Sequence, residues 1–142
     1  HYTSPNPATI VRAIQETIQD ASLAPADIQY VNAHGTSTPK GDRTEIGCLR
    51  EVFGKRLEQV PVSSNKSQLG HTLGATAAIE AALTIEGMRQ GIILPTINYF
   101  PDPEFADVDV VPNTARKQQY EISLSNAFGF GGTNCCVIFR GV

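Results

Sequence analysis

The sequence lacks the features that mark several classes of protein. No run of about 18 apolar residues is present, so no segment is long enough to be a membrane-spanning helix. The 11 basic residues are outnumbered by 14 acidic ones, for a net charge of −3. Such a chain lacks the clustered basic face that nucleic-acid binding requires. The hydrophobic content of 41% is too high for a disordered chain.

Cysteine is also scarce, and its spacing excludes further classes. Cys48 stands alone and Cys135 and Cys136 are adjacent, so no C-x-x-C spacing supports a zinc or thioredoxin-type site. An odd number of cysteines favours a reduced, intracellular compartment. We expect all three thiols to lie in the hydrophobic core.

The length of 142 residues fits one domain that can bury a core without disulfides or a structural metal. The chain opens His1-Tyr2-Thr3-Ser4, with no initiator methionine and no signal peptide. This opening favours a piece of a longer protein. We therefore treat residues 1–142 as one domain that need not be self-sufficient.

The hydrophobic pattern predicts a mixed α/β fold. The second predicted helix begins at a capping box formed by Asp42 and Glu45, and the third is Ala-rich on nearly every side, which favours a central, tightly packed position. The last two predicted strands flank a glycine-rich turn suited to a hairpin. Helices are expected over residues 7–21, 42–53 and 72–90, and strands over residues 27–33, 60–62, 121–125 and 135–139.

Three polar loops follow strand-like segments, and in open α/β sheets functional sites lie beyond the carboxyl ends of the strands. The first loop contains His34, the second contains Lys66 and His71, and the third is the glycine-rich turn around Phe130. Each feature also has a structural interpretation: a turn histidine, a residue in the first turn of a helix, and a hairpin with packed aromatic rings. Their joint occurrence favours a site.

The residue types in these loops suit the stabilisation of a developing negative charge. His71 precedes a predicted helix whose dipole, together with Lys66, disfavours the imidazolium. A neutral imidazole can donate a hydrogen bond to an oxyanion or enolate. The glycines around Phe130 suit a movable gate or a backbone donor. Glu80, if buried, requires a cation such as Lys66 as its partner.

No attacking group is evident among these residues. The serines lack the G-x-S-x-G context of a nucleophile elbow. The glycine-rich turn lacks the G-x-G-x-x-G spacing of a dinucleotide site and precedes a strand rather than a helix.

Three motifs in this chain, taken together and in order, resemble the β-ketoacyl-acyl-carrier-protein synthases, and most closely the type II elongating enzymes. They are the histidine motif at residues 32–42 (NAHGTSTPKGD), the lysine and second-histidine motif at 64–75 (SNKSQLGHTLGA), and the C-terminal glycine-rich gate at 125–134 (SNAFGFGGTN). The resemblance covers essentially the whole chain.

The resemblance implies the C-terminal half of a thiolase-like layered αβαβα fold. It implies an acyltransferase that performs a decarboxylative Claisen condensation of an acyl thioester with malonyl-carrier protein, in fatty acid or polyketide chain elongation. The cysteine nucleophile of the family would lie in an absent N-terminal half, and none of the three cysteines here matches its context. We therefore expect the isolated fragment to be inactive.

The resemblance also implies roles for individual residues. His34 and His71 would hold the malonyl thioester oxygen and stabilise the enolate, and Lys66 would hold His71 in place and keep the site positive. Substrate-contacting residues would be Thr36 and Thr38 along the pantetheine arm and Phe128 and Phe130 in the gate. A monovalent cation, the only bound group implied, would be surrounded by Asn32, Glu80, Ser125 and Asn126.

The implied partners are an acyl carrier protein, the N-terminal half of the same synthase and, in the intact enzyme, a second copy. Neither nucleic acid nor a membrane is implied. The implied location is the cytoplasm, or a plastid or mitochondrion in a eukaryote. The alternative is a non-catalytic partner like the chain-length factors, but such subunits often lose site residues, and His34, Lys66 and His71 are intact.

Overall fold

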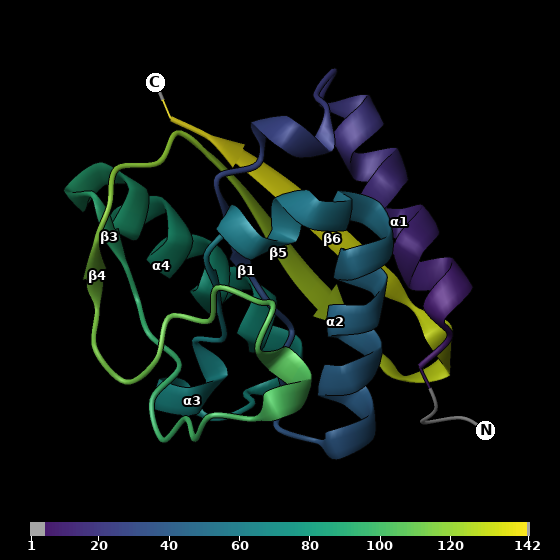
Figure 1. Ribbon diagram of the computed structural model, residues 1–142. Helices are drawn as coiled ribbons and strands as arrows, with labels where there is room; N and C mark the ends of the chain where they lie inside the picture. Colours follow the sequence, from purple (N-terminus) through teal and green to yellow (C-terminus); the bar gives the residue numbers. More distant parts are fainter. Residues whose placement is uncertain (1–4, 142) are drawn as a thin grey trace.

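The computed structural model describes residues 5–141, so the His1–Ser4 opening lies outside the described residues. The elements follow the predicted order of helix, strand, helix, strand, helix and hairpin (Figure 1). The α-helices are α1 (Pro7–Asp20), α2 (Pro39–Phe53), α3 (Lys66–Leu69) and α4 (Thr76–Gln90). The strands are β1 (Tyr30–Asn32), β2 (Val62–Ser63), β3 (Ile92–Ile93), β4 (Arg116–Lys117), β5 (Ile122–Phe128) and β6 (Asn134–Arg140).

The main sheet has four strands in the order β2-β1-β5-β6. Strand β1 runs parallel to both β2 and β5, whereas β6 returns antiparallel to β5 as the predicted hairpin. The carboxyl ends of the three parallel strands therefore meet at one edge of the sheet. Strands β3 and β4 form a separate antiparallel pair that was not predicted, because each is only two residues long.

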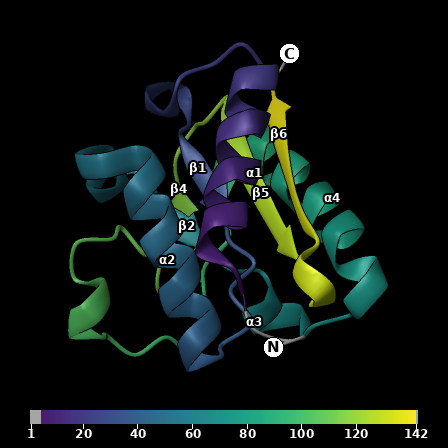
Figure 2. The ribbon, with the colours of Figure 1, turned by 90° about the vertical axis from the view of Figure 1, so that its right-hand side faces the viewer.

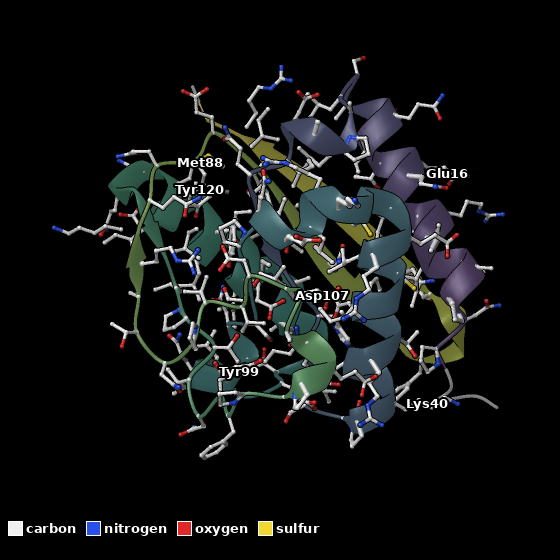
Figure 3. The ribbon with its side chains drawn as sticks, in the orientation of Figure 1. Glu16, Lys40, Met88, Tyr99, Asp107 and Tyr120 are labelled. Atoms are coloured by element: carbon white, nitrogen blue, oxygen red, sulfur yellow. The ribbon has the colours of Figure 1, made fainter. Side chains whose placement is uncertain are left out.

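Helices α1 and α2 cover one face of this sheet, and α4 lies on the other (Figures 1 and 2). Helix α1 buries an apolar stripe at the predicted positions, among them Ile14 and Ile18. Helix α4 buries Thr76, Glu80, Thr84 and Met88, and Figure 3 shows Met88 beside Tyr120, with which it packs.

The expectation that the Ala-rich helix is enclosed on all sides is not met among the described residues. The side of α4 that faces away from the sheet exposes Ala78, Ala82 and the larger Ile79 and Ile85. No element among residues 5–141 covers Ala78 and Ala82, so the helix combines a largely polar buried stripe with an apolar exposed one.

Two helices begin at residues other than those predicted. Helix α2 starts at Pro39, three positions before Asp42, because a proline ring presets the backbone for the first helical turn. Asp42 and Glu45 therefore do not form a capping box; Asp42 Oδ1 instead accepts the Ser37 N–H at 3.2 Å. Helix α4 starts at Thr76 because Leu73–Ala75 forms a separate 3-10 turn.

The carboxyl-terminal ends of these helices were predicted more accurately than their starts. Gly54 ends α2, and Gly91 ends α4 in the left-handed conformation at φ 64°. The segment 95–116, a long connection that contains little regular structure, has many exposed residues but buries Val108 and Val111. Arg50 Nε holds this segment against α2 through Asp107 Oδ2 at 2.8 Å (Figure 3 labels Asp107).

The cysteine prediction is only partly correct. Cys48 is buried in α2 as expected, whereas Cys135 is exposed and Cys136 is half-buried. Successive side chains of a strand point to opposite faces, so the two neighbours in β6 cannot share one environment. All three are free thiols. None of the described helices has both the length and the apolar character needed to cross a membrane.

Candidate active site

The predicted site residues gather where the three parallel strands end. His34 follows β1, Phe128 ends β5, and His71 follows α3, which itself follows β2. The His34 ring lies 5.7 Å from the His71 ring in an edge-on arrangement and 5.3 Å from the ring of Phe128. The convergence of the three loops, predicted from the sequence, is confirmed.

The hydrogen bonds of the two histidines fix the position of their protons. The backbone N–H of Phe128 donates to His34 Nδ1 at 3.3 Å, and that of Leu73 donates to His71 Nδ1 at 3.3 Å. A ring nitrogen that accepts a hydrogen bond carries no proton, so each neutral ring holds its proton on Nε2. The site therefore offers two Nε2–H donors on neighbouring rings.

A further contact holds His71. The Thr76 hydroxyl lies 3.0 Å from His71 Nδ1 and, since that nitrogen is an acceptor, donates to it. Thr76 is the first residue of α4, so the ring is fixed to the start of this helix.

The electrostatics of the site keep His34 neutral. Burial is the main cause that lowers the pKa of His34 to about 4, and the positive charge of Lys66 and the proximity of His71 act in the same direction. At neutral pH the His34 ring is therefore a hydrogen-bond donor without a charge.

Lys66 and Glu80 form a buried ion pair. Lys66 Nζ lies 2.7 Å from Glu80 Oε1, and the two side chains are 5% and 1% exposed. The predicted network of these residues is confirmed. The expected contact between Lys66 and His71 is not the one formed: Lys66 donates to Glu80, whereas Thr76 and Leu73 hold His71.

Three of the four residues expected around a cation lie on the α4 side of the sheet. The Asn32 amide donates to Ser125 Oγ at 3.0 Å, and Glu80 comes from the helix that covers this face. The Asn32 Oδ1 and Glu80 Oε2 atoms are buried without a hydrogen-bond partner. Asn126 differs, because its amide donates to Glu45 Oε1 at 3.1 Å on the α2 side, so its side chain does not join the other three.

Acidic, histidine and cysteine residues do not provide an alternative metal centre. Among residues 5–141, no group of three or more of these side chains is arranged to hold a metal ion. The oxygens of Asn32, Ser125 and Glu80 are instead the ligand type that hard cations prefer.

The residues expected to contact substrate lie at the outer side of the site. Thr36 Oγ1 and Thr38 Oγ1 are 3.2 Å apart, with Thr38 exposed. The Phe130 ring is 64% exposed in the 3-10 turn Phe130–Gly132, where Gly131 and Gly132 have φ values of 74° and 83°. Such left-handed backbone favours glycine, which accounts for the glycine-rich sequence of this turn.

Glu45 is a site residue that the sequence did not reveal. Its carboxylate, 3% exposed, accepts the backbone N–H groups of His34 and Gly35, both at 2.9 Å, and the Asn126 amide. Burial raises the pKa of Glu45, and these hydrogen bonds partly offset that effect. The available signal was a carboxylate on the apolar face of α2, beside Ile46 and Leu49, which the capping-box interpretation obscured.

Residues 1–100 match the family model described as the C-terminal domain of β-ketoacyl synthases. The 3-oxoacyl-[acyl-carrier-protein] synthase 2 of Staphylococcus aureus is 43% identical over 143 aligned residues, which cover 99% of this chain and 35% of that protein. The synthase of the same name from Vibrio harveyi is also 43% identical, over 99% of this chain and 34% of that protein. The chain thus spans about a third of the length of the curated relatives it matches.

Solved structures agree with these relatives. A β-ketoacyl synthase from Burkholderia phymatum overlaps all of this chain with a TM-score of 0.93 and 45% identity, over 34% of its own length. A type II polyketide ketosynthase in complex with its acyl carrier protein overlaps equally well, with a TM-score of 0.93 and 32% identity over 35% of its length. The predicted fold class, a mixed α/β fold of the thiolase-like ketosynthases, is confirmed.

Proposed function

The chain belongs to the β-ketoacyl synthase family, whose C-terminal domain it matches, and from this membership we propose that it supplies the decarboxylation site of a condensing acyltransferase. The substrates of the proposed reaction are an acyl thioester and a malonyl thioester on an acyl carrier protein. The reaction is a decarboxylative Claisen condensation that extends a fatty acid or related chain by one unit.

In the proposed reaction, the bond between the malonyl carboxylate and its α-carbon breaks, and CO₂ leaves. The bonding electron pair forms the C=C bond of a thioester enolate, and negative charge develops on the thioester oxygen. The α-carbon then attacks the carbonyl carbon of an acyl group held as a thioester on a cysteine. The C–S bond breaks, and the cysteine leaves as a thiolate.

One observation carries this proposal: the His34 and His71 rings lie edge-on to each other, and each receives a backbone N–H at Nδ1, which leaves Nε2–H as its donor. A pair of such donors suits a single oxygen on which charge develops during the reaction. His34 is uncharged at neutral pH, so it donates a hydrogen bond to the oxygen and keeps its proton. The enolate therefore stays reactive toward the acyl group.

Lys66 contributes a positive charge close to these rings, and Glu80 holds its ammonium group in place. We assign Lys66 to the electrostatics of the site rather than to direct support of His71. Thr36 and Thr38 are proposed to contact the pantetheine arm, and Phe128 and Phe130 to form the gate.

We also propose that a monovalent cation binds among Asn32, Ser125 and Glu80, because two buried oxygens there, Asn32 Oδ1 and Glu80 Oε2, lack a hydrogen-bond partner. Such a cation would supply a partner for Glu80 Oε2, while Lys66 binds Oε1 of the same carboxylate. Replacing Na⁺ and K⁺ by tetramethylammonium is expected to lower the unfolding temperature of the protein. An unchanged unfolding temperature would remove the cation from the proposal.

The exposed side of α4 supports a second proposal, namely that the N-terminal half of the same synthase covers it. Leu73 is 68% exposed, Ile85 42% and Ile79 37%, and these side chains follow one another along the helix and the turn before it. The family relatives are about three times as long as this chain, so residues outside the matched part are available to bury this surface. From the family resemblance alone, we propose that the complete protein is a homodimer in the cytoplasm.

The acyl carrier protein is the proposed partner that delivers both thioesters. The similar type II ketosynthase in complex with its carrier protein supports this assignment for the chain. The alternative of a non-catalytic chain-length-factor partner is not favoured, because His34, Lys66 and His71 are all present and assembled in one site.

Condensation assays test the proposed function. The complete gene product that contains this sequence is expected to convert acyl and malonyl carrier-protein thioesters into a 3-oxoacyl thioester with release of CO₂. The isolated chain of 142 residues is expected to form no such product. Activity of the isolated chain, or decarboxylation without condensation by the complete product, would contradict the proposed division of the site between two parts of the sequence.

A further inference from the structure

Ser64 makes a direct contact between the loops that carry the two histidines. It lies in the segment between β2 and α3, two residues before Lys66, and is buried with 7% exposure. Its hydroxyl donates to the carbonyl oxygen of Gly35 at 2.8 Å, and Gly35 follows His34. The residue thus links the loop after β1 with the loop after β2.

We propose that Ser64 is a positioning residue, which sets the location of the His34 ring relative to His71 and Lys66. This inference rests on the proposed function, because it assumes that both histidines bind the same reacting thioester oxygen. Ser64 itself does not touch the substrate in this proposal and acts only through the backbone of Gly35.

The backbone beside His34 is held from both sides. Glu45, from α2, accepts the N–H groups of His34 and Gly35, and Ser64 donates to the Gly35 carbonyl. Both polar groups of the Gly35 residue are therefore bound by side chains from different elements. The Gly35 backbone cannot shift toward Glu45 without breaking the hydrogen bond from Ser64, and it cannot shift toward Ser64 without breaking the hydrogen bond to Glu45.

The contact between the loops is also close in steric terms. A Cβ atom added to Gly35 would lie 2.6 Å from the Cβ atom of Ser64, nearer than side-chain atoms approach one another. Gly35 also has a φ of 39°, a backbone angle that residues with a side chain rarely adopt. Glycine at this position permits the approach that the Ser64 hydrogen bond requires.

Ser64 is itself held by hydrogen bonds of its backbone, so it can fix the backbone of Gly35 beside His34. Its backbone N–H donates to Thr96 Oγ1 at 2.9 Å, and its carbonyl accepts the Ser67 hydroxyl at 2.9 Å. The next turn of chain is α3, whose first residue, Lys66, is bound to Glu80 of α4. A continuous set of contacts therefore runs from α2 through the His34 loop to α3 and α4.

A displaced His34 ring is expected to slow decarboxylation more than acyl transfer. Decarboxylation requires both Nε2–H donors to lie near 3 Å from one oxygen, and displacement of a group by about 1 Å can lower a rate by about 10²-fold. Transfer of the acyl group to the cysteine does not use the pair of histidines in this way. Loss of the Ser64 hydroxyl should therefore affect the two half-reactions unequally.

The test compares Ser64→Ala with Ser63→Ala in the complete gene product. Ser63→Ala is the matched control, since it removes a hydroxyl from the neighbouring residue that bonds to Tyr30 and to the Leu94 carbonyl, not to Ser64 or Gly35. Ser64→Ala is expected to slow decarboxylation of a malonyl thioester by about 10-fold to 10²-fold, while acyl transfer changes by less than about 2-fold. Ser63→Ala is expected to show no such difference between the half-reactions.

A double variant separates this inference from the proposed function. Once His34→Ala has removed the ring, adding Ser64→Ala should cause no further loss of decarboxylation, because Ser64 acts through His34. Equal losses in both half-reactions, or losses that simply add, would overturn the positioning role. If His34→Ala itself leaves decarboxylation intact, the proposed function fails instead. Should Ser64→Ala not fold, Ser64→Cys, with its weaker donor, must give the same imbalance to a smaller degree or the inference is overturned.

Discussion

On the α1 and α2 side of the sheet, the buried side chains are mainly apolar, with Ile14, Leu49 and Leu124 fully enclosed and with Glu45 and Asn126 as buried polar residues near the site. On the α4 side, the same sheet buries Asn32, Ser123 and Ser125 against the polar stripe of α4. Four buried atoms without a hydrogen-bond partner lie on the α4 side, namely Asn32 Oδ1, Glu80 Oε2, Thr84 Oγ1 and Ser123 Oγ, whereas Asn126 Oδ1 lies on the α2 side.

The two faces differ in what their buried side chains contribute. Burial of apolar surface stabilises the fold, by roughly 1.5–3 kcal/mol for each large side chain. Burial of polar groups without full hydrogen bonding costs free energy and persists where it serves a function. We infer that the first face mainly holds the sheet together and that the second face supplies most of the polar groups of the site, which Glu45 joins from α2.

The largest expected effect comes from breaking the buried ion pair on the polar face. Lys66→Met leaves the Glu80 carboxylate buried without a partner, which is expected to cost about 3–5 kcal/mol in the free energy of unfolding. The double variant Lys66→Met with Glu80→Gln, which removes both charges, is the control and should recover most of that loss. Chemical denaturation measures both. A loss below about 1 kcal/mol in the single variant would show that the pair is not structurally important.

On the apolar face, Ile14→Ala tests whether stability and activity are separate. Ile14 has no exposed surface, so its truncation is expected to cost about 2–5 kcal/mol in unfolding free energy. The rate of malonyl decarboxylation per folded molecule should stay unchanged, because Ile14 lies across the sheet from the histidines. A fall in that rate would show that the two faces are coupled.

The pH dependence of stability gives a smaller effect from the site itself. The folded pKa of His34 is about 4, below its ordinary value of 6.5, so the unfolded chain binds the proton more readily between these values. The contribution of His34 is fully present above pH 6.5 and is lost as the pH falls toward 4. His34→Gln should flatten this part of the stability profile, measured by denaturation between these pH values. An unchanged slope would show that His34 titrates normally.

The smallest effect is expected where the polar face carries an unpaired hydroxyl. Thr84 Oγ1 is buried without a partner, so Thr84→Val, which replaces the hydroxyl by a methyl group of similar size, should change stability by less than about 1 kcal/mol or increase it. The backbone carbonyl of Thr84 keeps its bond from Tyr120. Thermal unfolding measures the change, and a clear destabilisation would reveal a hydrogen bond at this hydroxyl.

The comparison of the two faces also explains what the sequence could predict. The stripe of α1 repeats every three to four residues and is buried where expected, since one helix and one apolar face determine it. The loops with His34, Lys66 and His71 were placed together because parallel strands end at one edge. These features depend on local patterns and on the direction of the strands.

The features that could not be predicted depend on contacts between distant residues. Glu45 lies in α2, and its partners His34 and Asn126 are 11 and 81 residues away along the chain. The pairing of Lys66 with Glu80 rather than His71 follows from the packing of α3 against α4. The position of Asn126 on the opposite face from Ser125 follows instead from the alternation of side chains along β5, which runs to Phe128 and not only to residue 125 as expected. The exposed apolar side of α4 has no covering element within the described part of the chain, so no pattern in these residues reveals its partner.

The central claim is that His34 and His71 together stabilise the charge formed when malonyl thioester loses CO₂. The most direct measurement is the rate of that decarboxylation in the complete gene product with His34→Ala and with His71→Ala. Each variant is expected to lower the rate by about 10²–10³-fold, as the loss of one donor to a developing oxyanion commonly does. Retention of the rate in both variants would contradict the account.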